Sequence, residues 1–240
     1  MSFEPIIIVL IAPILAVFYL GISSKHADRD NHIILRNSFY LGVLSFIPGI
    51  LLIYLLDSFD LATTRSLNRT LFFAFAVVGL MEELPKFVVF RIYTYRTKAF
   101  NSPIRGILYS VAIALGFIVA KNAYFIFTNG GLHFSEPSGF LSAPFHILFA
   151  IIMGFFISFA RFRYSYFIFP LLGLGVAAFF HGLYQFALFT GDNNLLLITG
   201  GITLLIAILL FRQALNTQRD DIDHIRREEL KKELKGDRNT

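Results

Sequence analysis

Two adjacent carboxylates and an ammonium group interrupt a long apolar stretch of this chain. The segment LFFAFAVVGLMEELPKFVVF, residues 71–90, contains Glu82, Glu83 and Lys86 among residues otherwise suited to a membrane interior. Ionisable side chains at such a depth are costly, so they mark candidate functional sites. Glu82 and Lys86 are four residues apart and share a helix face, so they can form an ion pair. Glu83 is rotated by about 100° from Glu82 and is free to point elsewhere.

Four consecutive apolar segments carry polar side chains of this kind, and the remaining ones carry no charge near their centres. The three later segments contribute Lys121 with Asn122, then His146, then His181 with Gln185. Their estimated depths are similar, so we predict that they meet in one cavity. The candidate catalytic residues are therefore Glu82, Glu83, Lys86, Lys121, Asn122, His146, His181 and Gln185.

These residue types are those of an amide hydrolase without a serine or cysteine nucleophile, and the chain has no cysteine at all. A buried carboxylate acts as a general base toward water, and a histidine holds or protonates the reacting group. An amide or ammonium group stabilises an oxyanion. One glutamate and two histidines also form a metal-ligand set, with Glu83, His146 and His181 as candidates and zinc as the candidate metal. The H-E-x-x-H arrangement is absent, so both mechanisms stay open.

The elements that position these residues are predicted to be helices that cross a lipid bilayer. Of the 240 residues, 56% are hydrophobic, and the mean hydropathy is +0.66. The apolar excess lies in runs of the length that a bilayer-spanning helix needs, about 20 residues. The strands of a membrane β-barrel would instead be about 10 residues of alternating polarity. We predict an all-α polytopic integral membrane protein with about seven spans, at 4–22, 38–56, 69–91, 104–127, 140–160, 165–189 and 195–213.

The distribution of lysine and arginine predicts the orientation of these helices. The loops expected after spans 1, 3 and 5 are basic, as is the chain after span 7, whereas those after spans 4 and 6 have no lysine or arginine. The positive-inside rule then places the N-terminus outside and the C-terminus in the cytoplasm. This pattern accounts for the net charge of +5 without nucleic acid as a partner. Residues 1–215 are predicted to form the transmembrane domain, and residues 216–240 a charged cytoplasmic tail, a solvated helix near the membrane.

Four short pieces of the sequence resemble the PrsW family of intramembrane proteases, which is related to the CAAX-type membrane endopeptidases. The pieces are GLMEELPK at 79–86, GFIVAKNAY at 116–124, APFH with a later glycine at 143–154, and HGLYQ at 181–185. The resemblance covers residues 70–190, the motif-bearing core. It implies that Glu82 and Glu83 contain the water-activating base, and that Lys86, His146 and His181 complete the motifs.

The resemblance also implies a location and a substrate class. It predicts an integral protein of the bacterial cytoplasmic membrane that cuts membrane-anchored proteins near the outer leaflet. Single-pass regulators such as anti-sigma factors would be its substrates, and the lipid bilayer its surroundings.

Two basic residues depart from the family pattern and leave alternatives open. Relatives usually have an acidic residue immediately before Asn122, where this chain has Lys121, and Arg105 also stands where an acidic residue is common. An ammonium group at position 121 would pair with Glu82 or Glu83 and leave a weaker base, oppose a divalent cation, or donate to an oxyanion. A catalytically impaired relative that binds a membrane partner is therefore one alternative. A transporter is another, although the chain lacks inverted-repeat symmetry.

Overall fold

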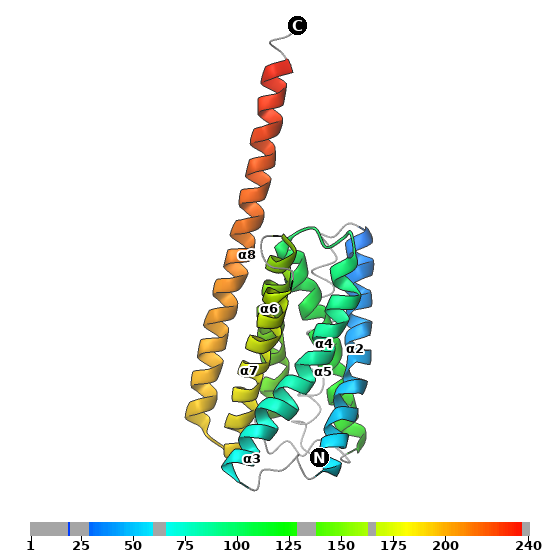
Figure 1. Cartoon of the computed structure of the whole chain (residues 1–240), viewed down its shortest axis with the longest axis vertical. Helices are drawn as coiled ribbons and strands as arrows, with labels where there is room; N and C mark the ends of the chain where they lie inside the picture. Colours follow the sequence, from blue (N-terminus) through cyan, green and yellow to red (C-terminus); the bar gives the residue numbers. More distant parts are fainter. Residues whose placement is uncertain (1–18, 20–28, 60–65, 129–137, 163–166, 237–240) are drawn as a thin grey trace.

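The structure, a computed structural model, is all-helical in the part of the chain that it describes: residues 19, 29–59, 66–128, 138–162 and 167–236. The helices stand side by side as a bundle, and the last of them extends well beyond it (Figure 1). The described elements are α2 (Arg29–Ser58), α3 (Leu67–Phe72), the π-helix η1 (Phe73–Leu80), α4 (Met81–Ile92), the 3-10 turn η2 (Thr94–Arg96), α5 (Pro103–Thr128), α6 (Ser138–Phe162), α7 (Ile168–Thr190) and α8 (Asn193–Gly236).

Five of these helices are long and apolar enough to cross a membrane. Their spanning parts correspond to the predicted second, fourth, fifth, sixth and seventh spans: Asn31–Leu56, Pro103–Tyr124, Ser142–Phe162, Ile168–Thr190 and Asn193–Arg219. The predicted first span, 4–22, lies outside the described residues except for Tyr19. The predicted third span corresponds to three consecutive segments, α3, η1 and α4. The total of seven spans and the orientation with the N-terminus outside stay predictions.

The region of the predicted third span changes its hydrogen bonding along its length. Residues 73–80, FAFAVVGL, form the π-helix η1, and the α-helical pattern resumes at Met81, immediately before the two glutamates. Gly79 lies in this segment against the backbone of α7, and a Cβ placed on it would come 2.7 Å from the carbonyl oxygen of Ala178. The π-helix and the glycine together set how the carboxylates of α4 approach α7.

Glycines also bring α2, α5 and α6 into close contact. Added Cβ atoms on Gly42 and Gly116 would overlap carbonyl oxygens of Ile113 and Phe39 in the facing helix, so α2 and α5 touch through their backbones. A Cβ on Gly154 of α6 would come 2.9 Å from the Cα of a residue in α5. Small residues allow such close approach inside a bilayer, where packing holds helices together. Gly154 therefore allows the backbones of α5 and α6 to approach closely.

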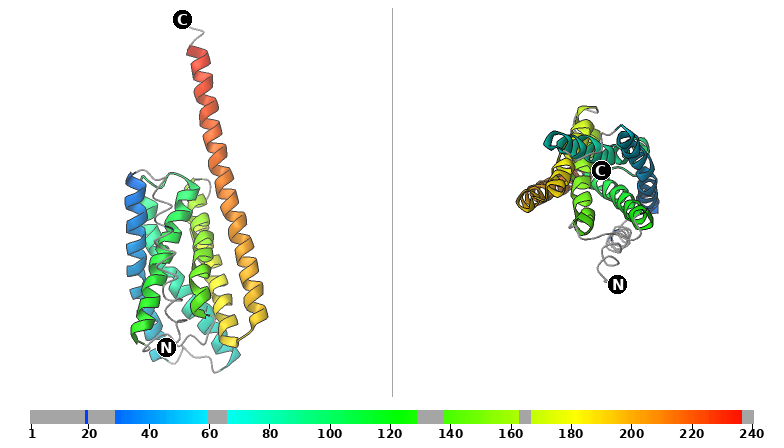
Figure 2. Two further views of the ribbon diagram at one scale, coloured as in Figure 1. Left: turned by 180° about the vertical axis from the view of Figure 1, so that it is seen from behind. Right: turned by 90° about the horizontal axis from the view of Figure 1, so that it is seen from below.

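The helix α8 is a single uninterrupted helix of 44 residues. At about 1.5 Å per residue it is roughly 66 Å long, about twice the thickness of a hydrocarbon core. Its first part is apolar enough to span a membrane, and the rest continues along the same direction away from the bundle (Figures 1 and 2). The predicted tail after position 216 is thus helical up to Gly236, and no break in the helix marks its beginning.

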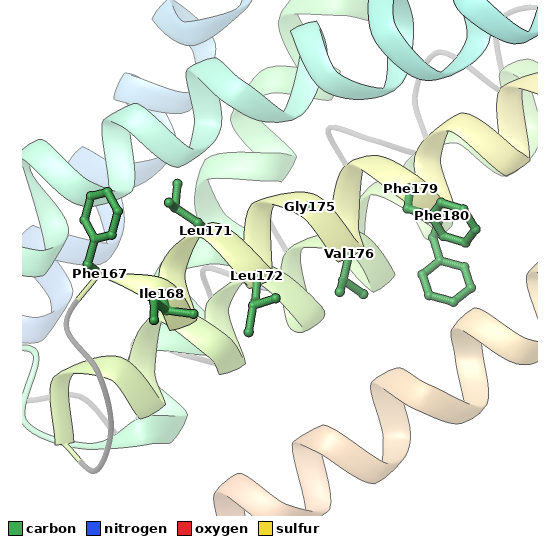
Figure 3. A pocket seen from close by; sticks show the side chains of 8 residues that line it. All are labelled: Phe167, Ile168, Leu171, Leu172, Gly175, Val176, Phe179 and Phe180. Carbon is green, nitrogen blue, oxygen red and sulfur yellow. The ribbon is translucent and has the colours of Figure 1, made fainter.

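An apolar groove of about 470 Å³ follows the first half of α7 (Figure 3). Its lining contains no ionisable side chain, so the groove suits a hydrocarbon chain and provides no catalytic group. The lining residues are Phe167, Ile168, Leu171, Leu172, Gly175, Val176, Phe179 and Phe180. The candidate catalytic residue of α7, His181, follows directly after this set and is fully buried.

Candidate active site and metal centre

Six of the eight predicted site residues come together inside the bundle. The helix α4 contributes three of them, and α5, α6 and α7 contribute one each. Five of the side chains belong to residues that are at most 4% exposed, and the sixth, Lys121, has 13% of its side chain exposed. Asn122 and Gln185 are half-buried and form no hydrogen bond with this cluster among the described residues. We call the following set the buried cluster: Glu82, Glu83, Lys86, Lys121, His146 and His181.

Glu83 contacts the Nδ1 side of both histidines. Its Oε1 accepts a hydrogen bond from Lys86 Nζ at 2.6 Å, and it lies 2.9 Å from His181 Nδ1. The same oxygen is 3.7 Å from His146 Nδ1, which is itself 3.0 Å from Lys86 Nζ. Hydrogen bonds between ionised groups are short and strong. Glu83 therefore ties α4 to α7 and fixes the orientation of His181.

Glu82 faces the opposite, Nε2 side of the same histidines. Its Oε2 lies 3.7 Å from His146 Nε2 and 3.8 Å from His181 Nε2. Both of its oxygens accept hydrogen bonds from Lys121 Nζ, at 2.6 and 2.8 Å. The two glutamates therefore lie on opposite sides of the histidine pair.

The ion pairs differ from the pair expected within one helix. Lys86 pairs with Glu83, three residues away, and Glu82 pairs with Lys121 of another helix, instead of the pair of Glu82 with Lys86 that the spacing allows. Residues at i,i+3 and i,i+4 are both neighbours on a helix surface. The rotation of α4 about its axis, relative to α5 and α7, determines whether Lys86 pairs with Glu83 at i,i+3 or with Glu82 at i,i+4. The expectation that an ammonium at position 121 reaches one of the glutamates is confirmed.

The hydrogen bonds around His181 assign its tautomer. An ionised carboxylate only accepts, so the proton shared with Glu83 belongs to Nδ1 of His181. Nε2 then keeps its lone pair, and this buried atom has no hydrogen-bond partner among the described residues. The ring of His181 stacks on Phe149, with 4.9 Å between centroids and 20° between planes. His181 thus presents a fixed, unused nitrogen toward Glu82.

The residues Glu82, His146 and His181 fit a divalent metal. One ligand atom from each lies within 4.8 Å of the others. Ligands about 2.0–2.2 Å from a tetrahedral metal are roughly 3.4 Å apart, slightly less than the distances from Glu82 to the two histidines. The free Nε2 of His181 is the kind of donor that such a site needs. The predicted ligand Glu83 instead lies on the Nδ1 side, where a carboxylate orients a metal-binding histidine.

Aromatic rings enclose the buried cluster. Lys86 Nζ lies 4.2 Å from the centroid of the Phe117 ring, a cation–π contact, and Phe117 also packs near His146. Phe149 and Tyr184 pack near His181. Sequence reasoning did not select Phe149 or Tyr184. Their only signal is helical spacing, because each is three residues after a histidine and so shares its face.

Comparisons with known proteins show a family relationship over most of the chain. A sequence profile described as PrsW family intramembrane metalloprotease matches residues 32–214. A protein named Protease PrsW from Oceanobacillus iheyensis is 28% identical over 213 residues, which cover 84% of this chain and 91% of that protein. A protein of the same name from Bacillus subtilis is 29% identical over 189 residues, 76% of this chain and 82% of that protein. No solved structure matches this chain.

The matched region includes the buried cluster and every helix that contributes to it. Both relatives are bacterial and are named proteases. Together with five helices able to span a membrane, they place this protein in the bacterial cytoplasmic membrane. The chain belongs to the PrsW family of intramembrane proteases.

Proposed function

We propose that this protein is an endopeptidase that hydrolyses peptide bonds of membrane-anchored proteins within the bilayer, near the outer leaflet. The observation that supports this best is the arrangement of Glu82 opposite the Nε2 atoms of two histidines, in a site closed off from bulk water. Hydrolysis of an amide bond by water needs a general base and a histidine of fixed orientation whose Nε2 can take up a proton.

Water activation falls to Glu82 and His181 in this proposal. Glu82 Oε2 and His181 Nε2 are 3.8 Å apart, a separation at which one water molecule can contact both. The water gives a proton to one of these atoms while its oxygen attacks the carbonyl carbon. The proton then passes to the nitrogen of the leaving amine as the C–N bond breaks. Glu83 does not touch the water; it holds His181 in the tautomer that leaves Nε2 free.

The same residues would hold a divalent metal. When bound, the metal would polarise the carbonyl group and activate water at neutral pH. The ligands would be Glu82, His146 and His181, with Glu83 as the carboxylate that orients His181. Lys86 keeps Glu83 in place, and Phe117 and Phe149 exclude bulk water.

The position of the site along the helices agrees with cleavage near the outer leaflet. His146 lies about two turns after the start of α6, and His181 about two and a half turns before the end of α7. Both of these helix ends face outside in the predicted orientation. Single-pass regulators such as anti-sigma factors, the class implied by the sequence resemblance, are the proposed substrates.

The first test is cleavage of a single-pass membrane reporter by purified protein in liposomes. We expect Glu82→Gln and His181→Ala each to lower the cleavage rate by roughly 10²-fold or more, because each removes a group that handles the proton of water. Lys98→Gln is the matched control, since Lys98 is exposed and lies after η2, outside the buried cluster. Wild-type cleavage rates in both site variants would exclude the proposed site. Absence of cleavage by the wild-type protein would favour the catalytically impaired relative.

A further inference from the structure

The buried cluster balances its own charge. It contains two carboxylates, Glu82 and Glu83, and two ammonium groups, Lys86 and Lys121, and each carboxylate is paired with one ammonium at 2.6 Å. The two histidines are neutral when one nitrogen of each carries a proton. The net charge of the cluster is therefore zero without any metal ion. Buried ions are tolerated when they are paired in this way.

A divalent metal would disturb this balance. It would add two positive charges to a site that already has an ammonium group on the carboxylate that must serve as a ligand. An excess of charge in a buried site is costly, because the surroundings cannot solvate it. One of the two lysines therefore has to leave the cluster, or metal binding is weak.

The two lysines differ in how easily they can leave. Lys86 is 3% exposed and contacts Glu83, His146 and the ring of Phe117. Lys121 contacts Glu82, and 13% of its side chain is exposed. It also holds both oxygens of Glu82, including the Oε2 that faces the histidines. Lys121 is thus the group that stands where a metal ion would bind the carboxylate.

We propose that Lys121 is a built-in counter-ion that competes with a divalent metal for Glu82. In this view the ion pair of Lys121 with Glu82 and the metal-bound form of the site exclude each other. The protein then binds metal only when Lys121 leaves the carboxylate. This inference rests on the proposed metal site, and it adds a residue that sets the affinity of that site.

Zinc binding by the purified full-length protein in detergent tests the inference. The dissociation constant is measured by competition with a chromogenic chelator for the wild type, Lys121→Met and Lys121→Arg. We expect Lys121→Met to bind zinc roughly 10- to 100-fold more tightly than the wild type, the range of effects seen for residues next to metal ligands. Lys121→Arg keeps the charge and should bind like the wild type. Lys98→Met, an exposed lysine replaced in the same way, should leave the affinity unchanged.

Thermal unfolding with and without zinc is a second measurement, and a further variant ensures that the test does not depend on purifying Lys121→Met alone. Lys121→Met leaves Glu82 buried without a counter-ion, so zinc should raise its thermal unfolding temperature more than that of the wild type. Lys121→Gln keeps a hydrogen-bond donor for Glu82 without the charge, and its zinc affinity should also exceed that of the wild type.

The proposed competition between Lys121 and zinc for Glu82 is wrong if Lys121→Met and Lys121→Gln bind zinc as weakly as the wild type or more weakly. It is also wrong if neither the wild type nor any variant binds zinc. The proposed protease is judged separately, by the dependence of reporter cleavage on Glu82 and His181. Either proposal can therefore fail while the other stands.

Discussion

Glu82 and Glu83 are neighbours in the sequence but contact different sides of the same two histidines. Glu83 is occupied by Lys86 and His181, whereas Glu82 faces two Nε2 atoms and the ammonium of Lys121. In the proposed mechanism this difference separates a positioning carboxylate, Glu83, from a reacting one, Glu82. It also means that the two glutamates should not respond alike to mutation.

The ion pair of Glu83 with Lys86 gives a prediction about stability. Glu83→Gln should lower the free energy of unfolding by about 3–5 kcal/mol, because it leaves the buried ammonium of Lys86 without an opposite charge. The double variant Glu83→Gln with Lys86→Met removes both charges and should recover most of that loss. Reporter cleavage should stay low in both, because His181 has lost the carboxylate that orients it.

Denaturant unfolding in detergent micelles measures the first effect, and the liposome cleavage assay measures the second. If the double variant is as unstable as Glu83→Gln alone, the unpaired charge of Lys86 is not the cause of the lost stability, and the prediction is wrong.

Most residues of the buried cluster could be selected from the sequence, but the pairings between them could not. Polar side chains inside apolar segments are conspicuous, and six of the eight selected residues meet in one cluster. Spacing within a helix shows which residues share a face, but it does not show how that helix is rotated against its neighbours. For that reason the pairing of Lys86 with Glu83, and the position of Glu82 as the candidate metal ligand, required the structure.

At the scale of elements, the contact of η1 with α7 determines how α4 approaches His181. A Cβ on Gly79 would come 2.9 Å from the backbone nitrogen of Gly182, and a Cβ on Gly182 would come 2.5 Å from the ring of Phe75. Neither helix can move closer, and neither glycine can be enlarged without separating them. Gly182 is adjacent to His181, and Gly79 is about one turn before Glu83.

Gly79→Ala should therefore lower the cleavage rate more than a glycine-to-alanine substitution in a helix normally does. The added methyl group meets the carbonyl oxygen of Ala178, so η1 must move away from α7 and carry Glu83 away from His181. A displacement of about 1 Å in a catalytic arrangement costs roughly 10²-fold in rate. The matched control is Gly175→Ala on α7, where an added Cβ meets nothing within 4 Å.

Gly175→Ala should keep wild-type cleavage and gain about 0.5–1 kcal/mol of stability, since alanine favours a helix. Cleavage rates and thermal unfolding temperatures of both variants measure these effects. Equal rates for the two variants would show that the contact of η1 with α7 does not position the site.

The predicted spans match the helices well in their centres and poorly at their ends. α2 begins at Arg29, well before the predicted start at 38, and α8 continues to Gly236, well past the predicted end at 213. Hydropathy marks the part of a helix that suits lipid, whereas polar residues can continue the same helix in water. The π-helix η1 was not predicted, because a segment that is apolar on all sides shows no change of period when its hydrogen bonds shift.

At the scale of the whole molecule, the helices differ in how much of their surface lies inside the protein. In the apolar centres of α5 and α6, 72% of the residues are buried, whereas in those of α2 and α8 the share is 22%. α5 and α6 contribute Lys121 and His146 to the buried cluster, and its other four residues come from α4 and α7. α2 and α8 contribute no residue to the buried cluster, and their segments are among those that carry no charge near their centres.

The predicted orientation can be tested with single cysteines, because the natural chain has none. Asn194→Cys lies in an exposed position at the start of α8, and Lys98→Cys lies in an exposed position after η2. A membrane-impermeant maleimide added to intact cells should label Asn194→Cys at once, since its loop is predicted to face outside. Lys98→Cys should be labelled only after the cells are permeabilised. The reverse pattern would invert the orientation and move the site toward the inner leaflet.

The zero net charge of the buried cluster also determines how it responds to membrane voltage. Carrying one elementary charge across a bilayer against 100 mV takes about 2.3 kcal/mol, and the electrical work is proportional to the charge that moves. Because the two ion pairs have no net charge, the resting potential of a bacterium changes the free energy of the cluster very little. A divalent ion arriving from outside would be drawn inward by that potential. Metal loading from the outer face, if the site takes a metal, should then be more complete in energised cells than in depolarised ones.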